Sequence, residues 1–552
     1  MLARLVMFSI AALSSAARAD DCERIPVWRG GRIAGVVCRA DAADQGLTVV
    51  DLGDDWVPPV LAPQPDGGPA YRETYVALAQ ERFADAGLDG TLARSDRYLE
   101  LYGIEPSLSV VRARLADAAR HRCHDAVADA PLGAAPARIA EEPKAEALAH
   151  AASSTRYREA VRAAQAHLAC DQLFDGPAYD GAYTWQTSNA VERFQKGVMM
   201  LPTGVLDGAT RAALAGNSRV RDWATALRVL RARVTAAEGL VEDGTAGAGQ
   251  GKVMGLALEP EATWRVRGSE PLDGAAPDLI SAATDTAARA LGWTTPAATL
   301  QFLDERTTRF VAIELPSPPR YHTPTMAIEI TIDRGDVWID PLPRDRDAAH
   351  RASLIVYTWD GARRIALARW PTTVGGWQDS QNGHDITKDW KESPVGPRVW
   401  RELLVGPSWL PAPTIPDREL VRATDQGWVL AREQFGPSYR AAFGFLAFVH
   451  RDREDLDDEG IRTHATANLT SLANNVSHGC HRMLGLHAVR LADFLLAHHG
   501  HEARGDQPVT YARVVRHGGE FPVKIDTLGY EIELMPPVPV EVLPGRIHRS
   551  AH

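Results

Sequence analysis

The stretch ANNVSHGCHRML, residues 473–484, contains Cys480, the last of five cysteines in a chain of 552 residues. Ser, His and Gly come directly before this cysteine, and His and Arg follow it. The stretch IRTHATANL, residues 461–469, places His464 at 480 − 464 = 16 positions upstream. A free cysteine is commonly a small buried hydrophobic residue, but such polar neighbours fit that role poorly. We therefore regard Cys480 as a candidate nucleophile.

The residues around this stretch predict strands before Cys480 and a helix after it. AFGFLAFVH, residues 442–450, is an apolar run of strand length, and Asp360-Gly361 divides residues 353–370 into a hairpin. After Cys480, apolar residues recur at helical spacing until Gly500, namely Leu484, Ala488, Leu491 and Leu495. Cys480 is therefore expected in the turn just before the N-terminus of this helix.

That position favours a reactive thiol. The positive end of a helix, together with the charge of Arg482, lowers the pKa of a thiol. A nearby histidine then accepts the thiol proton, which gives a thiolate–imidazolium pair able to attack a carbonyl. The backbone N–H groups of Gly479 and Cys480 are natural donors to an oxyanion. Acyl transfer is the reaction class that needs a nucleophile, an anion hole and a positive field together.

These motifs, together with SPVGPRVW at residues 393–400, resemble the catalytic domain of the L,D-transpeptidases, the YkuD type. The resemblance extends over residues 353–500. It implies a mainly-β domain with sandwich-like sheets and a helix after the catalytic cysteine. In that family Cys480 corresponds to the nucleophile and His464 to the general base and then the acid. The N–H groups of Gly479 and Cys480 hold the oxyanion, and three further residues line or shape the substrate pocket: Ser477, His478 and Arg482.

The reaction implied by the resemblance has two steps and no metal or organic cofactor. Cys480 attacks the peptide bond after the third residue of a tetrapeptide stem of peptidoglycan, and the terminal D-alanine leaves. An amine of a second stem then resolves the thioester, which gives a cross-link between two third-position residues. Water as acceptor would make the enzyme a carboxypeptidase, and a protein lysine would make it an anchoring enzyme. The residues do not separate these three acceptors.

Two positions differ from the family pattern. His481 stands where Ile or Val is usual, and an orientation toward solvent is the simplest expectation for its side chain. Ala465 follows the base where Gly or Ser is usual, but any residue at this place supplies the carbonyl that orients the imidazole. His450, at the end of a predicted strand, is the alternative base. The spacing of the motif favours His464, and a structural role is expected for His450.

The N-terminus reads as a secretory signal. Arg4 precedes an apolar stretch from Leu5 to Leu13, and a small-residue site predicts cleavage after Ala19. The apolar stretch is too short to span a bilayer as a helix, and no later segment is a candidate span. We therefore expect export across the inner membrane to the periplasm or cell wall.

Export changes the interpretation of the cysteines. Cys22, Cys38, Cys123 and Cys170 lie in the N-terminal third, and Cys480 stands alone. In an oxidising compartment four clustered cysteines predict two disulfides and one remaining thiol. Pairing of nearest neighbours, Cys22 with Cys38 and Cys123 with Cys170, is one of the three possibilities.

Residues 157–215 resemble the peptidoglycan-binding module of cell-wall enzymes, on the strength of AVERFQ, TGVLD and TRAAL in that order. Val191, Phe194 and Val198 form the apolar face of a predicted helix, and Asp207 can cap a second, shorter helix. For Gln195 and Asp207 we expect roles in packing and turn formation. A small helical bundle without a ligand is the alternative.

The chain as a whole is predicted to be an α+β protein of several domains. Its net charge of 60 − 71 = −11 disfavours nucleic acid as the main partner. The family resemblance implies peptidoglycan stem peptides as the partner. EDGTAGAGQGK, residues 242–252, reads as a Gly-rich linker. The expected divisions are a signal peptide 1–19, a disulfide-containing α+β region 20–150, a helical module 155–218, an α+β scaffold 253–345, a catalytic domain 350–502 and a C-terminal β extension and tail 503–552.

Three other interpretations compete with this assignment. One is a cell-wall endopeptidase or amidase, in which the histidine normally follows the cysteine; here it precedes it. Another is a catalytically silent wall-binding scaffold, which would not require the sequence Ser-His-Gly-Cys. The third is a metal cluster at His121, Cys123 and His124, but these residues have no second pair of ligands nearby, so structural roles are expected there.

Overall fold

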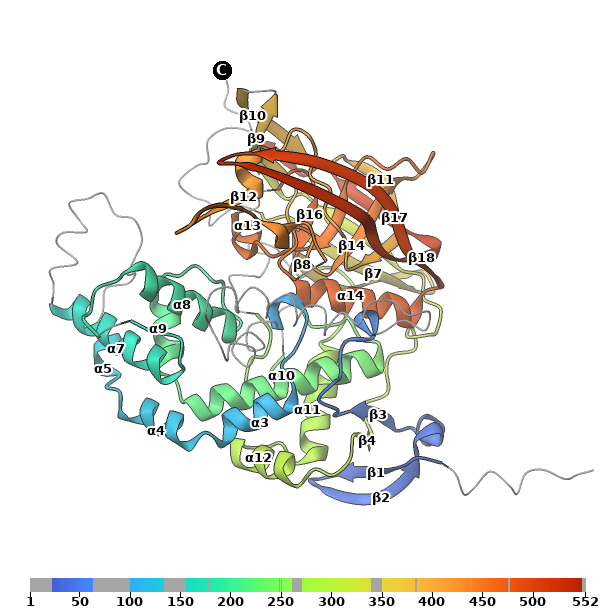
Figure 1. Cartoon of the computed structure of the whole chain (residues 1–552). Helices are drawn as coiled ribbons and strands as arrows, with labels where there is room; N and C mark the ends of the chain where they lie inside the picture. Colours follow the sequence, from blue (N-terminus) through green and yellow to red (C-terminus); the bar gives the residue numbers. More distant parts are fainter. Residues whose placement is uncertain are drawn as a thin grey trace, which may run out of the picture.

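The computed structural model describes residues 22–62, 100–133, 155–176, 179–247, 249, 251–260, 271–338, 350–382, 385–437, 439–474 and 477–548. The predicted signal peptide, residues 1–19, lies outside this part of the chain. The described residues form a mixed α and β protein in which a helical module and a helix-covered small sheet adjoin one large sheet (Figure 1).

The small sheet joins two regions that the sequence analysis separates. Its order is β2-β1-β4-β3, and β4 comes from the predicted scaffold 253–345, whereas its neighbours come from 20–150. The two regions are therefore one unit. Its strands are β1 (Arg24–Arg29), β2 (Arg32–Cys38), β3 (Thr48–Asp51) and β4 (Phe310–Ile313). The helices packed on it are α3 (Leu108–Ala116), α10 (Ser218–Glu238), α11 (Leu279–Leu291) and α12 (Pro296–Glu305), which share one apolar core with β3 and β4.

The helical module follows the sequence prediction closely. It consists of α7 (Thr155–Cys170), α8 (Trp185–Gly197) and α9 (Gly208–Ala215). Val191 and Phe194 are buried, and the carboxylate of Asp207 accepts the Thr210 N–H that would otherwise be orphaned at the start of α9. The buried amide of Gln195 accepts from Gly204 N–H at 2.9 Å and donates to the Val205 carbonyl at 3.0 Å. The expected packing and turn roles of Gln195 and Asp207 are confirmed.

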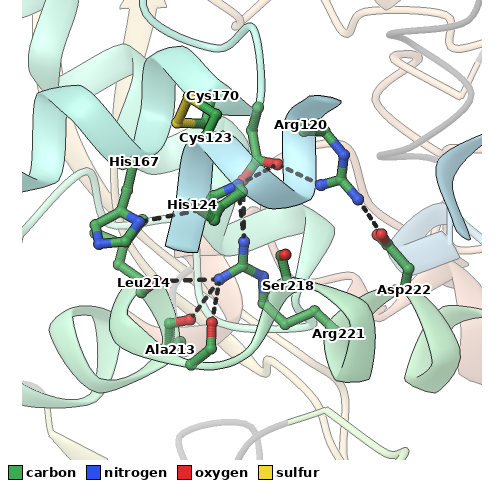
Figure 2. A network of polar contacts seen from close by, with 12 residues as sticks. Arg120, Cys123, His124, His167, Cys170, Ala213, Leu214, Ser218, Arg221 and Asp222 are labelled. Atoms are coloured by element: carbon green, nitrogen blue, oxygen red, sulfur yellow. Dashed lines mark hydrogen bonds and ion pairs between the residues drawn. A yellow bond between two sulfur atoms is a disulfide. The ribbon is translucent and has the colours of Figure 1, made fainter. Parts of the chain in front are cut away.

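Both predicted disulfides are present, and Cys480 is free. Cys123–Cys170 joins α4 (Ala118–Ala126), which is followed by α5 (Ala130–Gly133), to α7 of the module, so it crosses the predicted boundary between residues 150 and 155. Figure 2 shows the polar network beside this bond. His124 bonds to His167 and to Asp171, both at 3.0 Å, so its two ring nitrogens are used within the protein.

The large sheet has nine strands in the order β16-β15-β14-β11-β18-β5-β7-β8, with β17 paired to β18. Their bounds are β5 (Glu329–Asp333), β7 (Ser353–Asp360), β8 (Arg363–Pro371), β11 (Gly396–Val405), β14 (Leu446–Asp452), β15 (Arg462–Ala465), β16 (His481–Met483), β17 (His501–Arg516) and β18 (Glu520–Leu543). Three strand pairs lie beside it: β9 (Gly375–Asn382) with β10 (Asp385–Glu392), β12 (Val421–Thr424) with β13 (Gly427–Leu430), and β6 (Asp336–Trp338) with β19 (Arg546–His548).

The large sheet extends past both ends of residues 350–502, the range predicted as a catalytic domain. β18, from the expected extension 503–552, pairs with β11 on one side and β5 on the other, so it is an interior strand. β5, from the expected scaffold 253–345, pairs with β7. The hydrophobic pattern identifies each strand, but nothing local in the sequence shows which distant strand lies beside it.

Residues 242–252 are not a free linker. Glu242 and Asp243 are fully buried, and Asp243 forms an ion pair of 3.0 Å with Arg490 on α14 (Gly485–His498). The indole N–H of Trp370 donates to Asp243 at 2.7 Å. The prediction of a linker fails because both carboxylates find partners in the core: Asp243 pairs with Arg490, and Glu242 bonds to the His322 ring at 2.7 Å. Figure 1 shows α14 between the large sheet and α10, where this contact lies.

None of the helices in the described ranges has the length and apolar character needed to cross a membrane.

Candidate active site

Two parallel neighbouring strands bring Cys480 and His464 to the same face of the large sheet. β15 and β16 pair with His464 opposite Arg482. Side chains alternate along a strand, so Arg462 and His464 share a face on one strand, and Cys480 and Arg482 share it on the other. A parallel pair requires a crossover of about a dozen residues, and the 16-residue spacing supplies it, with α13 (Leu469–Asn474) inside.

These four side chains line one cavity of about 1260 Å³, to which His478 and Gly460 also contribute. The Cys480 side chain is partly exposed, whereas His464 is buried. The cavity therefore brings together the predicted nucleophile and the predicted base, with two arginines beside them.

The imidazole of His464 is held in one orientation. Its Nδ1 donates to the carbonyl of Ala465 at 2.5 Å, and its ring packs edge-on against Phe443 with centroids 4.8 Å apart. A carbonyl can only accept, so the proton is on Nδ1 and the lone pair of Nε2 is left to accept a proton. The expectation that Ala465 supplies the orienting carbonyl agrees with this contact.

Burial keeps the imidazole of His464 and the thiol of Cys480 uncharged. It lowers the pKa of His464 to about 3, and the Arg482 cation acts in the same direction. Burial also raises the pKa of the Cys480 thiol, although the backbone N–H of Arg462 and the charges of Arg462 and Arg482 oppose the shift. The thiol points to the Gly460 carbonyl at 3.9 Å.

The sequence-based expectation of a lowered thiol pKa is therefore wrong. Cys480 does not adjoin the helix N-terminus, because strand β16 comes between it and α14, which begins at Gly485. The field of a helix end falls off within about its first turn. The site instead places a neutral thiol and a neutral imidazole under the influence of two arginines.

Hydroxyl groups hold the loop that carries Cys480. Ser393, in the SPVG segment, donates to the Gly479 carbonyl at 2.6 Å, and Ser477 and Thr373 donate to the Cys480 carbonyl at 2.6 and 3.1 Å. Ser477 is buried and does not line the cavity, so it supports the loop and does not shape the pocket as expected. The Gly479 N–H already bonds to the Ser477 hydroxyl at 3.3 Å, which leaves the Cys480 N–H as the better candidate for the oxyanion.

His478 lines the cavity as expected. Burial lowers its pKa to about 4, and its Nε2 has no hydrogen-bond partner among the described residues. This nitrogen is itself buried, so His478 contributes a neutral ring to the cavity wall and does not expose Nε2 to a substrate.

His481 and His450 lie outside the cavity lining. The prediction that His481 faces solvent is wrong: the residue is fully buried, and its Nδ1 contacts the Thr373 carbonyl at 3.1 Å. The strand alternation that turns Cys480 into the cavity turns His481 to the other face. There it packs on His450, whose Nε2 accepts from the Trp400 indole at 3.0 Å. His450 thus has the structural surroundings that we expected.

The opposite part of the cavity was missed by the sequence analysis. Glu192, Arg193 and Lys196 of helix α8 line it, together with Tyr102 and Tyr439. The charged stretch ERFQK of α8 was a weak signal for such a role, but surface helices commonly carry charges of this kind. Only the packing of the module against the large sheet brings these residues to the cavity.

One buried cluster has the composition of a metal site. Asp243, Glu259 and His487 place ligand atoms within 4.8 Å of one another. Both carboxylates already pair with Arg490 at 3.0 Å, and Glu259 also pairs with Arg231. These guanidinium charges would repel a cation, so the cluster is better explained as a buried ion-pair network.

Comparison with known proteins identifies the module. The family of peptidoglycan binding domains matches residues 157–214, which include all of α8 and nearly all of α7 and α9. The match does not extend to Cys480. No curated protein matches the chain. The chain therefore contains a peptidoglycan-binding domain, which is consistent with a cell-wall-related protein, and its two disulfides fit an extracytoplasmic one.

Proposed function

We propose that the chain is an exported peptidoglycan L,D-transpeptidase that acts through a Cys480 thioester. The observation that supports the proposal is the cavity that Cys480 and His464 both line, together with helix α8 of the peptidoglycan-binding domain. A cell-wall polymer bound by the domain then has a nucleophile and a base within the same cavity.

In the acylation step, Nε2 of His464 takes the proton of the Cys480 thiol while the sulfur attacks the carbonyl carbon after the third stem residue. The Cys480 N–H stabilises the oxyanion, and Arg462 and Arg482 support the developing negative charge. His464 then gives the proton to the departing amine of the terminal D-alanine. The peptide bond is broken, and a thioester remains.

In the second step, an amine of another stem attacks the thioester and His464 accepts its proton. An amide bond forms, the carbon–sulfur bond breaks, and the proton returns to the sulfur, so that the thiol is regenerated. Water in place of the amine gives a carboxypeptidase, and a protein lysine gives an anchoring enzyme. Analysis of the products from purified sacculi, by chromatography of the muropeptides, distinguishes these acceptors.

The test of this proposal is covalent trapping of Cys480. A carbapenem, which the family resemblance implies as an acylating inhibitor, should add one molecule per chain, as measured by intact-mass spectrometry, with the adduct mapped to Cys480. Cys480→Ala should remain folded by circular dichroism and show no adduct. An unmodified wild-type protein, or an adduct at another residue, would contradict the assignment.

A further inference from the structure

Helix α8 of the peptidoglycan-binding domain forms part of the cavity wall opposite Cys480. Its residues Glu192, Arg193 and Lys196 line the cavity that also contains Cys480 and His464. The domain is therefore not a separate tether: one of its helices belongs to the site where the chemistry takes place.

Lys196 is the residue of this wall with the most defined surroundings. Its amine pairs with Glu192 one turn earlier at 2.7 Å and lies near Arg440 and the hydroxyl of Tyr102. Burial lowers the pKa of Lys196, but Tyr102 and Glu192 outweigh it, so the net shift is upward and the amine stays charged. An ammonium group has three N–H donors, and a contact with Glu192 leaves donors for a ligand.

The charges of the cavity lining favour an anion. Five cations outnumber four carboxylates, and they are Arg193, Lys196, Arg440, Arg462 and Arg482 against Asp175, Glu192, Glu419 and Glu433. Tyr102 and Tyr439 belong to the same lining. A ligand that carries a carboxylate next to an apolar or sugar surface has the matching chemistry.

Two separate sets of ring contacts involve the segment from Tyr439 to Phe445. Tyr102 packs on Tyr439 with ring centroids 5.2 Å apart, and Tyr439 packs on Phe445 at 6.3 Å. In the same segment Phe443 packs on His464 at 4.8 Å. Four residues of this segment, Tyr439, Arg440, Ala442 and Phe443, line the cavity, so the segment links the Tyr102 contact to the imidazole of His464.

The cavity is larger than the usual pocket for one small ligand. Pockets for single small ligands have volumes of roughly 300–1,000 Å³. The cavity here measures about 1260 Å³ and reaches from Cys480 to α8. It has room for a stem peptide at Cys480 and for a further part of the same polymer at α8.

We propose that Lys196 binds a stem-peptide carboxylate of an assembled glycan strand, at a subsite that α8, Tyr102 and Tyr439 form beside the Cys480 site. This inference rests on the proposed function for the identity of the polymer. It makes the preferred substrate an assembled, polymeric strand, because such a strand can present one stem to Cys480 and another to Lys196 at the same time.

The test measures binding without chemistry. In the full-length mature protein carrying Cys480→Ala, the Kd for soluble, uncross-linked glycan strands with tetrapeptide stems is measured by fluorescence anisotropy. Adding Lys196→Glu should raise this Kd at least tenfold at low salt, and the difference should shrink at high salt, where charges are screened. Lys196→Arg, which keeps the charge, should bind within twofold of the parent protein.

Arg156→Glu is the matched control, because Arg156 is an exposed cation on α7 of the same domain and does not line the cavity. It should leave the Kd within twofold. An unchanged Kd in Lys196→Glu, or an equal loss in Arg156→Glu, would overturn the proposal.

A second measurement separates this inference from the proposed function. With Cys480 intact, Lys196→Glu should be acylated by a carbapenem at the wild-type rate, because the inhibitor occupies only the Cys480 side. Loss of acylation together with loss of strand binding would contradict a binding role, since Lys196 would then support the fold. Failure of the wild-type protein to be acylated would instead remove the proposed function and leave the Kd comparison in place.

Discussion

At the scale of single residues, the reactivity of Cys480 depends on how a neutral thiol and a neutral imidazole exchange one proton. His464 presents Nε2 as a base because Nδ1 is engaged by the Ala465 carbonyl. Its pKa of about 3 means that the ring is neutral throughout the ordinary pH range. The thiol, whose pKa is raised by burial, is protonated over the same range. Proton transfer therefore accompanies the attack of sulfur on the carbonyl.

This arrangement predicts that the rate of acylation of Cys480 does not fall as the pH is lowered. Between pH 8 and pH 5 the second-order rate of carbapenem acylation should change less than twofold, because neither group titrates there. A histidine at its ordinary pKa of about 6.5 would halve the rate near that pH. Attack by a free thiolate would instead raise the rate about tenfold per pH unit. Stopped-flow measurements across this range, with folding checked at each pH, distinguish the three cases.

At the scale of elements, the geometry of the Cys480 loop depends on Gly479. Its φ of +104° lies in the region that favours glycine, and a Cβ there would meet the Glu392 carbonyl oxygen at 3.2 Å. The loop between β15 and β16 is thus held from outside by the segment before β11, through Ser393 as well. Local sequence alone would not hold the sulfur in place.

We therefore expect Gly479→Ala to reduce carbapenem acylation at least tenfold, because a shift of the loop displaces the nucleophile from its productive position. Gly361→Ala is the matched control: Gly361 also has a positive φ, of +63°, but a Cβ there meets nothing within 4 Å. Both variants lose some stability from backbone strain, so a comparable loss of acylation in Gly361→Ala would contradict the role given to the Gly479 contact.

At the scale of the whole molecule, a buried ion-pair network joins helix α10, which packs on the small sheet, to helix α14 beside the large sheet. Arg490 on α14 pairs with Asp243 and Glu259, and Glu259 pairs with Arg231 on α10. All four side chains are nearly inaccessible to water. The network sets the position of the helices relative to the sheet that carries Cys480.

Arg490→Met should lower the free energy of unfolding by about 3–5 kcal/mol, because it leaves Asp243 buried without its cation. The exposed pair of Arg320 with Asp360, at 2.9 Å, supplies the control, and Arg320→Met should cost less than about 1 kcal/mol. Urea unfolding followed by tryptophan fluorescence measures both values. If Arg490→Met changed the free energy of unfolding only slightly, the ion pairs would not be what holds α10 and α14 together.

Much of the local structure was predictable because its signals are local. The hairpin at Asp360-Gly361, the cap at Asp207 and the helix after Leu484 follow from turn chemistry, capping and apolar spacing. The disulfide pairing was one of three possibilities and was correct. The buried position of His481 and the raised pKa of Cys480 were not predictable, since both depend on which side chains pack around them.

By itself, the sequence determined the chemistry available: a cysteine after Ser-His-Gly, a histidine at crossover distance, and a module that matches peptidoglycan binding domains. Tertiary structure alone decided that β18 and β5 complete the large sheet and that Asp243 is buried in an ion pair with Arg490. It also decided that α8 lines the Cys480 cavity. The physical reason is the distance along the chain over which each kind of interaction acts. Spacing and capping act within a few residues, whereas strand partners, burial and shared cavities depend on contacts between segments hundreds of residues apart.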